Sequence, residues 1–177
     1  MNLFQKKELK VILWSYGDEG KTSLLYKGFK EIHNFPDFHT VGFNIESINF
    51  NGVNFKFIDI GGACKIKELR KGYLPTCDAL IFFIDSSQLL SKDNYLFERN
   101  LEEFQKCLNF IEDKPLLIAI TKIDIRKTST LDIIKAYQLD NLFKRKQKFG
   151  IIECSTVTSI GIKEIKYWLF EVAKNTK

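Results

Sequence analysis

Three runs of consecutive apolar residues constrain the fold of this 177-residue chain more than any other feature. They are Val11–Trp14, Ala79–Ile84 and Leu116–Ile120. Strands that are apolar at every position are typical of parallel sheets covered on both faces, whereas a half-exposed strand alternates apolar and polar residues. Each run is far shorter than the roughly 18 residues that a membrane-spanning helix needs. The runs therefore predict the central strands of an α/β domain.

Stretches with helical spacing and one hairpin signal separate these runs. Apolar side chains recur at helical intervals in residues 22–29, 95–110 and 162–172, which predicts helices packed on the sheet. Residues 43–60 carry Asn51-Gly52 at their centre with alternating apolar residues on both sides, a pattern typical of a β-hairpin with a type I′ turn. We therefore predict an α/β fold with a mostly parallel six-stranded sheet, one antiparallel edge strand and helices on both faces.

Composition favours one reduced globular domain. With 45% apolar and 28% charged residues, we expect a single domain over residues 1–177, of which 1–8 form a short amino-terminal extension. The four cysteines form no C-x-x-C pair, which favours reduced thiols in the cytosol over disulfides or zinc. The net charge of +5 is spread along the chain, and the basic clusters at 65–71 and 144–148 lack interleaved aromatic residues. Nucleic-acid binding is therefore not expected.

The segment after the first apolar run has the features of a phosphate-binding loop. Ser15-Tyr16-Gly17-Asp18-Glu19-Gly20-Lys21-Thr22 departs from G-x-x-x-x-G-K-[ST] only in its first residue. In such loops backbone N–H groups and the helix amino terminus bind phosphate oxygens, the lysine adds a cation and the threonine binds Mg²⁺. Asp18 and Glu19 must point outward, or they weaken phosphate binding. On this motif alone, a strand-to-helix turn that uses glycine only for its geometry stays open.

Polar residues after the later strands add a base site. Asp59-Ile60-Gly61-Gly62 ends the hairpin, Thr121-Lys122-Ile123-Asp124 ends the third apolar run, and Cys154-Ser155-Thr156 follows Ile151-Ile152. The Asp124 carboxylate can accept two hydrogen bonds from guanine, which adenine cannot donate. Lys122 would pack along the base, and the amides of Ser155 and Thr156 would meet the guanine O6. Because the carboxyl ends of parallel strands share one edge, we expect one nucleotide site there.

These motifs together resemble the small GTPases, and among them the Arf and Arf-like proteins. Thr40-Val41-Gly42-Phe43-Asn44 is similar to the family's switch I, Asp59-Ile60-Gly61-Gly62 to its switch II, and Leu24–Lys27 to its first helix. The resemblance implies a P-loop small G-protein fold that binds GTP or GDP with Mg²⁺ and a hairpin that slides in register between nucleotide states. It implies Mg²⁺ ligation by Thr22 and Thr40, and by Asp59 through a water. The nucleotide-binding residues implied are Gly17, Asp18, Glu19, Gly20, Lys21, Thr22, Ser23, Thr40, Gly62, Thr121, Lys122, Asp124, Ser155 and Thr156.

Several departures from the family modify these expectations. Ala63 stands where the family has the glutamine that orients the attacking water, so we expect slow GTP hydrolysis and no catalytic side chain at that position. Effectors would bind around Phe43, Ile58 and Tyr73, with isoleucine replacing the family's tryptophan. Asn2 replaces the acylated glycine, so the resemblance implies a cytoplasmic monomer with at most weak, peripheral membrane contact.

The resemblance also implies partners and leaves alternatives. An exchange factor, an activating protein and effectors in trafficking-type processes are expected. One alternative is a degenerate member that holds partner proteins without cycling nucleotide, favoured by Ser15, Glu19 and Ala63 occurring together. Another is a P-loop kinase of small molecules, which would leave Asp124 and the hairpin without a role.

Overall fold

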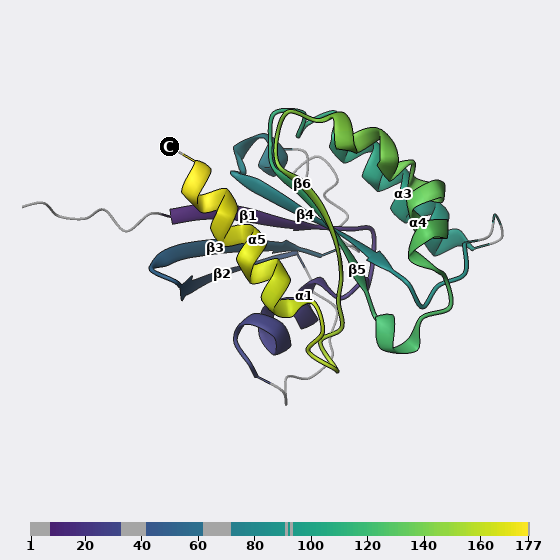
Figure 1. Ribbon diagram of the computed structural model, residues 1–177, viewed down its shortest axis with the longest axis horizontal. Helices are drawn as coiled ribbons and strands as arrows, with labels where there is room; N and C mark the ends of the chain where they lie inside the picture. Colours follow the sequence, from purple (N-terminus) through teal and green to yellow (C-terminus); the bar gives the residue numbers. More distant parts are fainter. Residues whose placement is uncertain (1–7, 33–41, 62–71, 91, 93, 177) are drawn as a thin grey trace, which may run out of the picture.

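A six-stranded sheet forms the centre of the protein. The computed structural model describes residues 8–32, 42–61, 72–90, 92 and 94–176. The strands are β1 (Glu8–Trp14), β2 (Phe43–Phe50), β3 (Val53–Ile60), β4 (Ala79–Asp85), β5 (Leu116–Thr121) and β6 (Phe149–Glu153). Their order is β2-β3-β1-β4-β5-β6, and every neighbouring pair is parallel except β2 and β3 (Figure 1). The predicted sheet, with one antiparallel edge strand, is confirmed.

Helices follow most of the strands. They are α1 (Lys21–Ser23), which continues as the π-helix η1 (Leu24–Phe29), α3 (Tyr95–Leu108), α4 (Thr130–Tyr137) and α5 (Ile162–Asn175), with short 3₁₀ turns η2 (Leu74–Thr76), η3 (Ile123–Ile125) and η4 (Leu139–Lys144). The sequence analysis did not predict α4. Its signal was the pair Ser129 and Asp132, because the Ser129 hydroxyl accepts a hydrogen bond from the Asp132 N–H at 3.2 Å and caps the helix.

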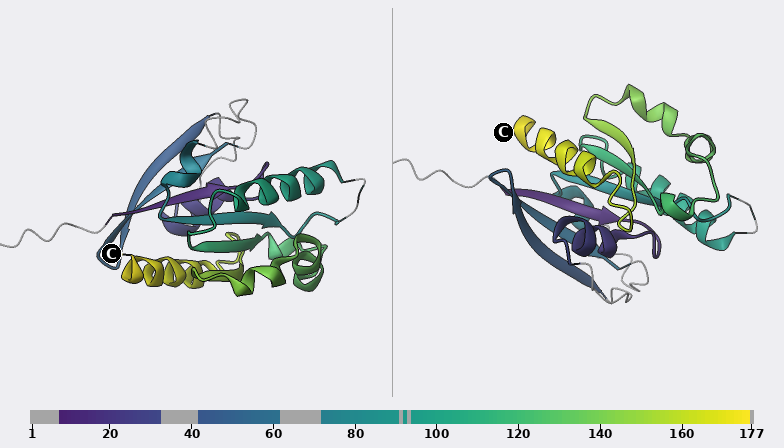
Figure 2. Two further views of the ribbon diagram at one scale, coloured as in Figure 1. Left: turned by 90° about the horizontal axis from the view of Figure 1, so that it is seen from above. Right: turned by 60° about the horizontal axis from the view of Figure 1, so that its bottom comes forward.

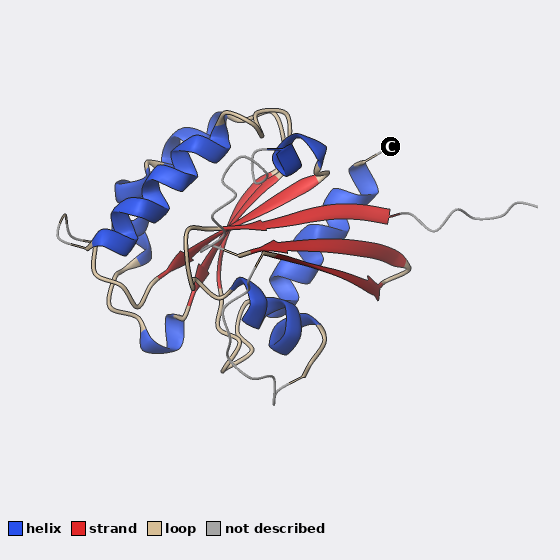
Figure 3. Cartoon of the chain, turned by 180° about the vertical axis from the view of Figure 1, so that it is seen from behind, coloured by secondary structure: helices blue, strands red, loops and turns tan. Residues whose placement is uncertain are grey.

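The two faces of the sheet carry separate cores, which explains the consecutive apolar runs. Leu9, Val11 and Leu13 of β1 pack with η1 and α5, whereas Ile12 and Trp14 pack with α3 and α4. Successive strand residues point to opposite faces, so a strand covered on both sides needs apolar residues throughout. Figures 2 and 3 show the strands running through the middle of the molecule with helices on both sides. Within the described residues, no helix has the length and apolar character needed to span a bilayer.

The β2–β3 hairpin turns at Asn51-Gly52 as predicted, and both residues have positive φ angles, 52° and 78°. A polar network then docks β2 onto the helix that follows β1. Glu46 accepts hydrogen bonds from the Tyr26 hydroxyl at 2.5 Å and the Lys30 ammonium at 2.6 Å, and the Asn44 amide donates to the Tyr26 oxygen at 2.9 Å. The network therefore joins the edge strand to the helix beside the phosphate-binding loop.

Gly161 is fixed by its close approach to the end of β6. Its φ of 77° precedes α5, and a Cβ built there would lie 2.0 Å from the Glu153 carbonyl oxygen and 2.9 Å from the Cys154 Cα. Both neighbours are held in position, the first by strand pairing and the second by its N–H bond to the Ile120 carbonyl at 2.7 Å. Only glycine fits this crossing of α5 and β6.

We expect Gly161→Ala to lower the free energy of unfolding by about 3 kcal/mol or more, because the backbone must shift to admit the methyl group. Gly52→Ala is the matched control: Gly52 also has a positive φ, but open space surrounds its Cα, so its cost should be about 1 kcal/mol. Urea denaturation of both variants measures the difference. Equal losses for the two would contradict the steric explanation.

The docking network predicts a pH-dependent contribution to stability. Despite an opposing effect of burial, hydrogen bonds from Lys30 and Tyr26 hold the pKa of Glu46 below its usual value. Its contribution is therefore present above the unfolded-state pKa and is lost as the pH falls through the folded-state value. Because the ion pair is partly solvent-screened, we expect Glu46→Gln to cost about 1 kcal/mol at pH 7 and almost nothing near pH 3.

Denaturation of both proteins at several pH values measures this difference. Glu102→Gln, in an exposed ion pair with Arg99, is the control and should show a smaller pH-dependent change. A Glu46→Gln cost that stays constant down to pH 3 would contradict the assignment.

Candidate functional site

The loops that follow five parallel strands meet at one edge of the sheet. β1, β3, β4, β5 and β6 run in the same direction, so the segments after their carboxyl ends are neighbours. The predicted phosphate and base motifs all lie on these segments. Residues separated by up to 102 positions in sequence form direct hydrogen bonds there.

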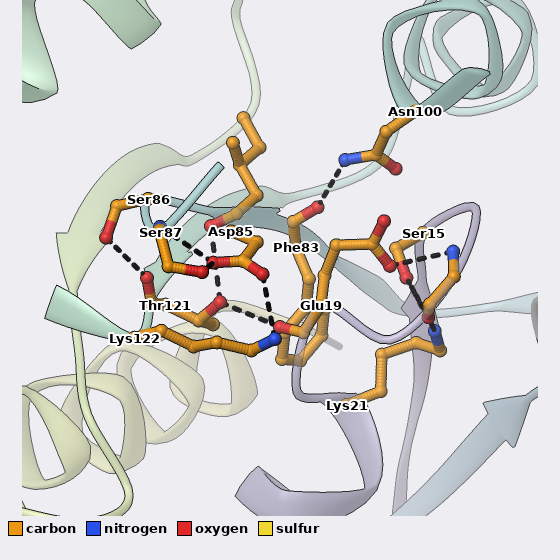
Figure 4. A network of polar contacts seen from close by, with 12 residues as sticks. Ser15, Glu19, Lys21, Phe83, Asp85, Ser86, Ser87, Asn100, Thr121 and Lys122 are labelled. Atoms are coloured by element: carbon orange, nitrogen blue, oxygen red, sulfur yellow. Dashed lines mark hydrogen bonds and ion pairs between the residues drawn. The ribbon is translucent and has the colours of Figure 1, made fainter. Parts of the chain in front are cut away.

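The phosphate-binding loop turns from β1 into α1 with its lysine folded over it. Gly20 has a φ of 93° at the amino terminus of α1. The Lys21 side chain is buried, and its ammonium donates to the Ser15 hydroxyl at 2.5 Å and to the Gly17 carbonyl at 2.7 Å (Figure 4). Ser15, the departure from the glycine motif, therefore contacts the lysine directly. Ser23, the last predicted residue of this segment, ends α1 and is partly buried.

The two acidic residues of the loop differ in direction. Asp18 is exposed, as expected, whereas Glu19 is 1% exposed and does not point outward. Its carboxylate accepts a hydrogen bond from the Gly17 N–H at 2.8 Å. Of the two outcomes set out for these residues, Asp18 takes the outward one and Glu19 does not, because the loop folds its side chain inward onto a backbone donor.

Residues of α3 hold the phosphate-binding loop in place. The Asn100 side chain, 2% exposed, accepts from the Tyr16 N–H at 2.9 Å and donates to the Phe83 carbonyl of β4 at 2.9 Å. The Tyr16 and Tyr95 hydroxyls are 3.1 Å apart. Sequence reasoning missed Asn100, although an amide beside the apolar stripe of Phe97, Leu101 and Phe104 was a usable signal.

The predicted Mg²⁺ residues come together from two motifs. The Thr22 hydroxyl donates to the Asp59 carboxylate at 2.5 Å, and Asp59 is fully buried at the end of β3. Hydroxyl and carboxylate oxygens are the donors that Mg²⁺ prefers, and such sites use few protein ligands together with phosphates and water. No group of three or more His, Cys, Asp or Glu side chains suited to a metal occurs in the described part of the chain. Thr40, Gly62 and Ala63 lie outside the described residues.

The base loop is tied to the phosphate-binding loop. The Thr121 hydroxyl donates to the Glu19 carbonyl at 2.7 Å, and the Thr121 carbonyl accepts from the Ser86 hydroxyl at 2.7 Å. The Lys122 ammonium donates to the Asp85 carboxylate at 2.8 Å, while the Lys122 backbone has a φ of 56° (Figure 4). Sequence reasoning missed Asp85 and Ser86, whose signal was a polar pair at the carboxyl end of a wholly apolar strand.

The residues predicted to read the guanine base lie on two neighbouring loops. Asp124 is exposed on η3, and Thr156 is partly exposed after β6. The buried Ser155 hydroxyl accepts from the Val157 and Thr158 N–H groups at 3.1 and 3.2 Å. The Ser155 N–H donates to the Ile160 carbonyl at 3.0 Å, so it would have to exchange this partner to meet the guanine O6, and its role at the base stays a prediction.

Burial affects the thiol chemistry of two of the described cysteines. Cys77, Cys107 and Cys154 are buried and unbridged. Burial raises the pKa of both Cys77 and Cys154 to about 12. Cys154, which adjoins the base loop, is therefore a protonated packing residue at neutral pH.

The predicted effector surface is partly wrong. Phe43 is 51% exposed, and its ring lies 5.8 Å from that of Tyr73. Ile58, however, is only 1% exposed. It lies on β3, between β2 and β1, and the Ile58 side chain joins the core that includes α3. Ile45, which pairs with Ile58 across the hairpin and is 43% exposed, takes the surface position. Sequence reasoning missed it.

Comparison with known proteins agrees with this geometry. The model of the ADP-ribosylation factor (Arf) family matches residues 1–173. Among solved structures, the Arl6 (BBS3) small GTPase of Trypanosoma brucei, determined with the bound nucleotide analogue GppNp, superimposes with a TM-score of 0.79 at 25% sequence identity. The alignment covers 97% of this chain and 100% of that one. The chain therefore belongs to the ADP-ribosylation factor family of small GTPases, and it is a GTP-binding switch.

Proposed function

We propose that this GTP-binding switch holds GDP and GTP together with Mg²⁺, recruits effector proteins in its GTP-bound state and hydrolyses GTP slowly. The observation that carries the proposal is the hydrogen bond between Thr22 and Asp59. It joins the phosphate-binding loop to the end of β3, where the chain enters the predicted switch II. A change at the terminal phosphate can thereby reach both the loop and the hairpin.

The phosphate end would work through Lys21 and Thr22. On nucleotide binding the Lys21 ammonium exchanges its Ser15 and Gly17 contacts for phosphate oxygens, which are stronger, charged acceptors. Asp59 accepts the hydrogen bond from the Thr22 hydroxyl, so the hydroxyl oxygen would be available to hold Mg²⁺. Bound Mg²⁺ would supply positive charge that offsets the charge on the phosphates.

The base end would select guanine through Asp124. An exposed carboxylate on η3 can approach the base from the solvent side and accept from its N1–H and N2–H groups. The Lys122 ammonium is held by Asp85, and the lysine stem would pack along the base. The Ser155 and Thr156 N–H groups are the candidates for the guanine O6, the first once it leaves the Ile160 carbonyl.

Slow hydrolysis rests on Ala63. Phosphoryl transfer depends almost entirely on positioning and electrostatics, and a methyl group cannot orient the attacking water. GTP would then persist until an activating protein supplies the missing group, and an exchange factor would restore GTP after hydrolysis. The expected state is a cytoplasmic monomer with at most weak, peripheral membrane contact.

The effector surface would centre on Phe43, Ile45 and Tyr73. These side chains form an apolar surface on the outer part of the hairpin and the turn before η2. A register shift of β2 and β3 would move Phe43 and Ile45 together, so this surface can report the nucleotide state. The recruited partners would act in trafficking-type processes.

A second candidate function is a protein-binding scaffold that does not cycle nucleotide. It is favoured by the buried Glu19 carboxylate in the phosphate-binding loop, together with Ser15 and Ala63. In that case the same apolar surface would bind partners in every nucleotide condition. The scaffold and the switch differ in bound nucleotide and in hydrolysis, which the next experiments measure.

Purified protein should release a guanine nucleotide when it is heat-denatured, and chromatography identifies the base. Asp124→Asn should weaken GDP binding by about 100-fold or more and improve xanthosine diphosphate binding, because an amide donates to the xanthine O2 instead of accepting from the guanine N2 group.

Asp140→Asn is the matched control, since this exposed aspartate lies on η4 outside the candidate site. It should leave both affinities unchanged. Wild-type protein that carries no guanine nucleotide and cannot be loaded with one in Mg²⁺ would overturn the switch and leave the scaffold.

Ala63→Gln should raise the single-turnover rate of GTP hydrolysis by about tenfold or more, because it restores a side chain able to orient water. Ala63→Met, of similar length without a hydrogen-bonding end, is the control and should give no rise. Phosphate release from protein preloaded with GTP measures both rates. No increase with glutamine, in a protein that holds GTP, would contradict the assignment of slow hydrolysis to Ala63.

A further inference from the structure

Glu19 is an unusual residue to find under a phosphate-binding loop. It is 1% exposed, and no ion pair to it forms among the residues that the structure describes. Its only described carboxylate contact is the hydrogen bond from the Gly17 N–H at 2.8 Å. Burying a carboxylate with one neutral donor and no cation costs folding free energy. Neutral residues could fill this position at lower cost, so the charge itself calls for an explanation.

The carboxylate lies on the underside of the loop. Figure 4 shows the Glu19 side chain pointing toward Ser15 and Asn100. Burial raises the pKa of the Tyr137 hydroxyl, the hydrogen bond that it accepts from the Asn100 amide at 3.3 Å lowers it, and the Glu19 carboxylate raises it. The Glu19 carbonyl is fixed by Thr121. The backbone of Glu19 is therefore fixed by Thr121, and its carboxylate is held by the Gly17 N–H, so turning the carboxylate out to solvent would break that hydrogen bond.

The positive groups of the phosphate site lie next to this charge. The N–H of Gly17 donates to the Glu19 carboxylate, and the carbonyl of Gly17 accepts from the Lys21 ammonium at 2.7 Å. Gly17 therefore lies between the two charges. A buried charge is weakly screened, so the carboxylate lowers the positive potential that Lys21 and the loop amides present to phosphates.

We propose that Glu19 is an internal counter-charge of the phosphate-binding loop, which weakens the binding of nucleotide phosphates in proportion to their negative charge and so speeds nucleotide release. The Gly17 hydrogen bond gives the residue a second effect, because it keeps the loop in shape. The proposal rests on the guanine-nucleotide binding proposed above. It adds that this chain binds nucleotide more weakly, and exchanges it faster, than it would with a neutral residue at position 19.

The two effects separate in two substitutions. Glu19→Gln removes the charge and keeps an oxygen that can accept from the Gly17 N–H, so it should bind GDP at least about tenfold more tightly and release it correspondingly more slowly. Glu19→Ala removes both, and its gain should be smaller because the loop loses its internal hydrogen bond. It also serves if the glutamine variant does not fold, because its gain should still grow with ligand charge.

A series of ligands of increasing negative charge distinguishes the effect of the Glu19 charge from the effect of its hydrogen bond. GMP, GDP and a non-hydrolysable GTP analogue are titrated into nucleotide-free protein at fixed Mg²⁺ and two salt concentrations. The gain in Glu19→Gln should rise from GMP to GDP and persist at the higher salt, since the charge is buried. Glu102→Gln, which changes the net charge equally at an exposed site on α3, should give little gain at either salt.

The outcomes are separable from those of the proposed function. Wild-type protein that binds no guanine nucleotide would remove the proposed function and this inference with it. If wild-type protein binds GDP, three results for Glu19→Gln would overturn the counter-charge and leave the switch. The affinities could be unchanged, they could be weaker, or they could change by the same factor for GMP and GDP. A gain that grows with ligand charge supports it.

Discussion

The parallel pairing of β1 with both β3 and β4 is the constraint on which the rest of the site depends. It places β1 inside the sheet, so the loop after Trp14 emerges between neighbouring strand ends instead of at an exposed edge. Asp59 then arrives from one side at the end of β3, and Asp85 from the other at the end of β4. The Thr22–Asp59 contact follows directly from this strand order.

A second layer of contacts fixes the loop that the sheet positions. Thr121 holds the Glu19 carbonyl from the base side, and Asn100 holds the Tyr16 N–H from α3. Each satisfies a backbone group that would otherwise be buried without a partner. The phosphate loop is therefore shaped before ligand arrives, and part of the entropy cost of binding is met during folding. The Glu19 carboxylate works in the opposite sense, since it lowers the potential that the shaped loop offers to anions.

The β2 edge is the part of the sheet whose attachment can change. β2 has one strand neighbour, and its outer face exposes Phe43 and Ile45. Its other face is docked in two ways: Glu46 binds Tyr26 and Lys30 through partly exposed polar contacts, and Ile48 and Phe50 pack against the core. The polar network joins β2 to the helix of the phosphate loop near the switch end of the strand, and the apolar packing lies toward the hairpin turn.

The sequence by itself determined the apolar strands, the Asn51-Gly52 hairpin and the motifs around Lys21, Asp59 and Asp124, because these signals are local patterns of apolar spacing, turn chemistry and donor type. Only the tertiary structure decided that Ile58 is buried and Ile45 exposed, since β3 is covered on both faces and its period does not reveal which side chains reach the surface. It alone placed Asn100 beneath the loop and turned Glu19 inward. The Asn100 contact joins residues that are 84 positions apart. The Glu19 carboxylate bonds the Gly17 N–H only two positions away, but its inward direction depends on how the whole loop folds, and no local pattern carries such information.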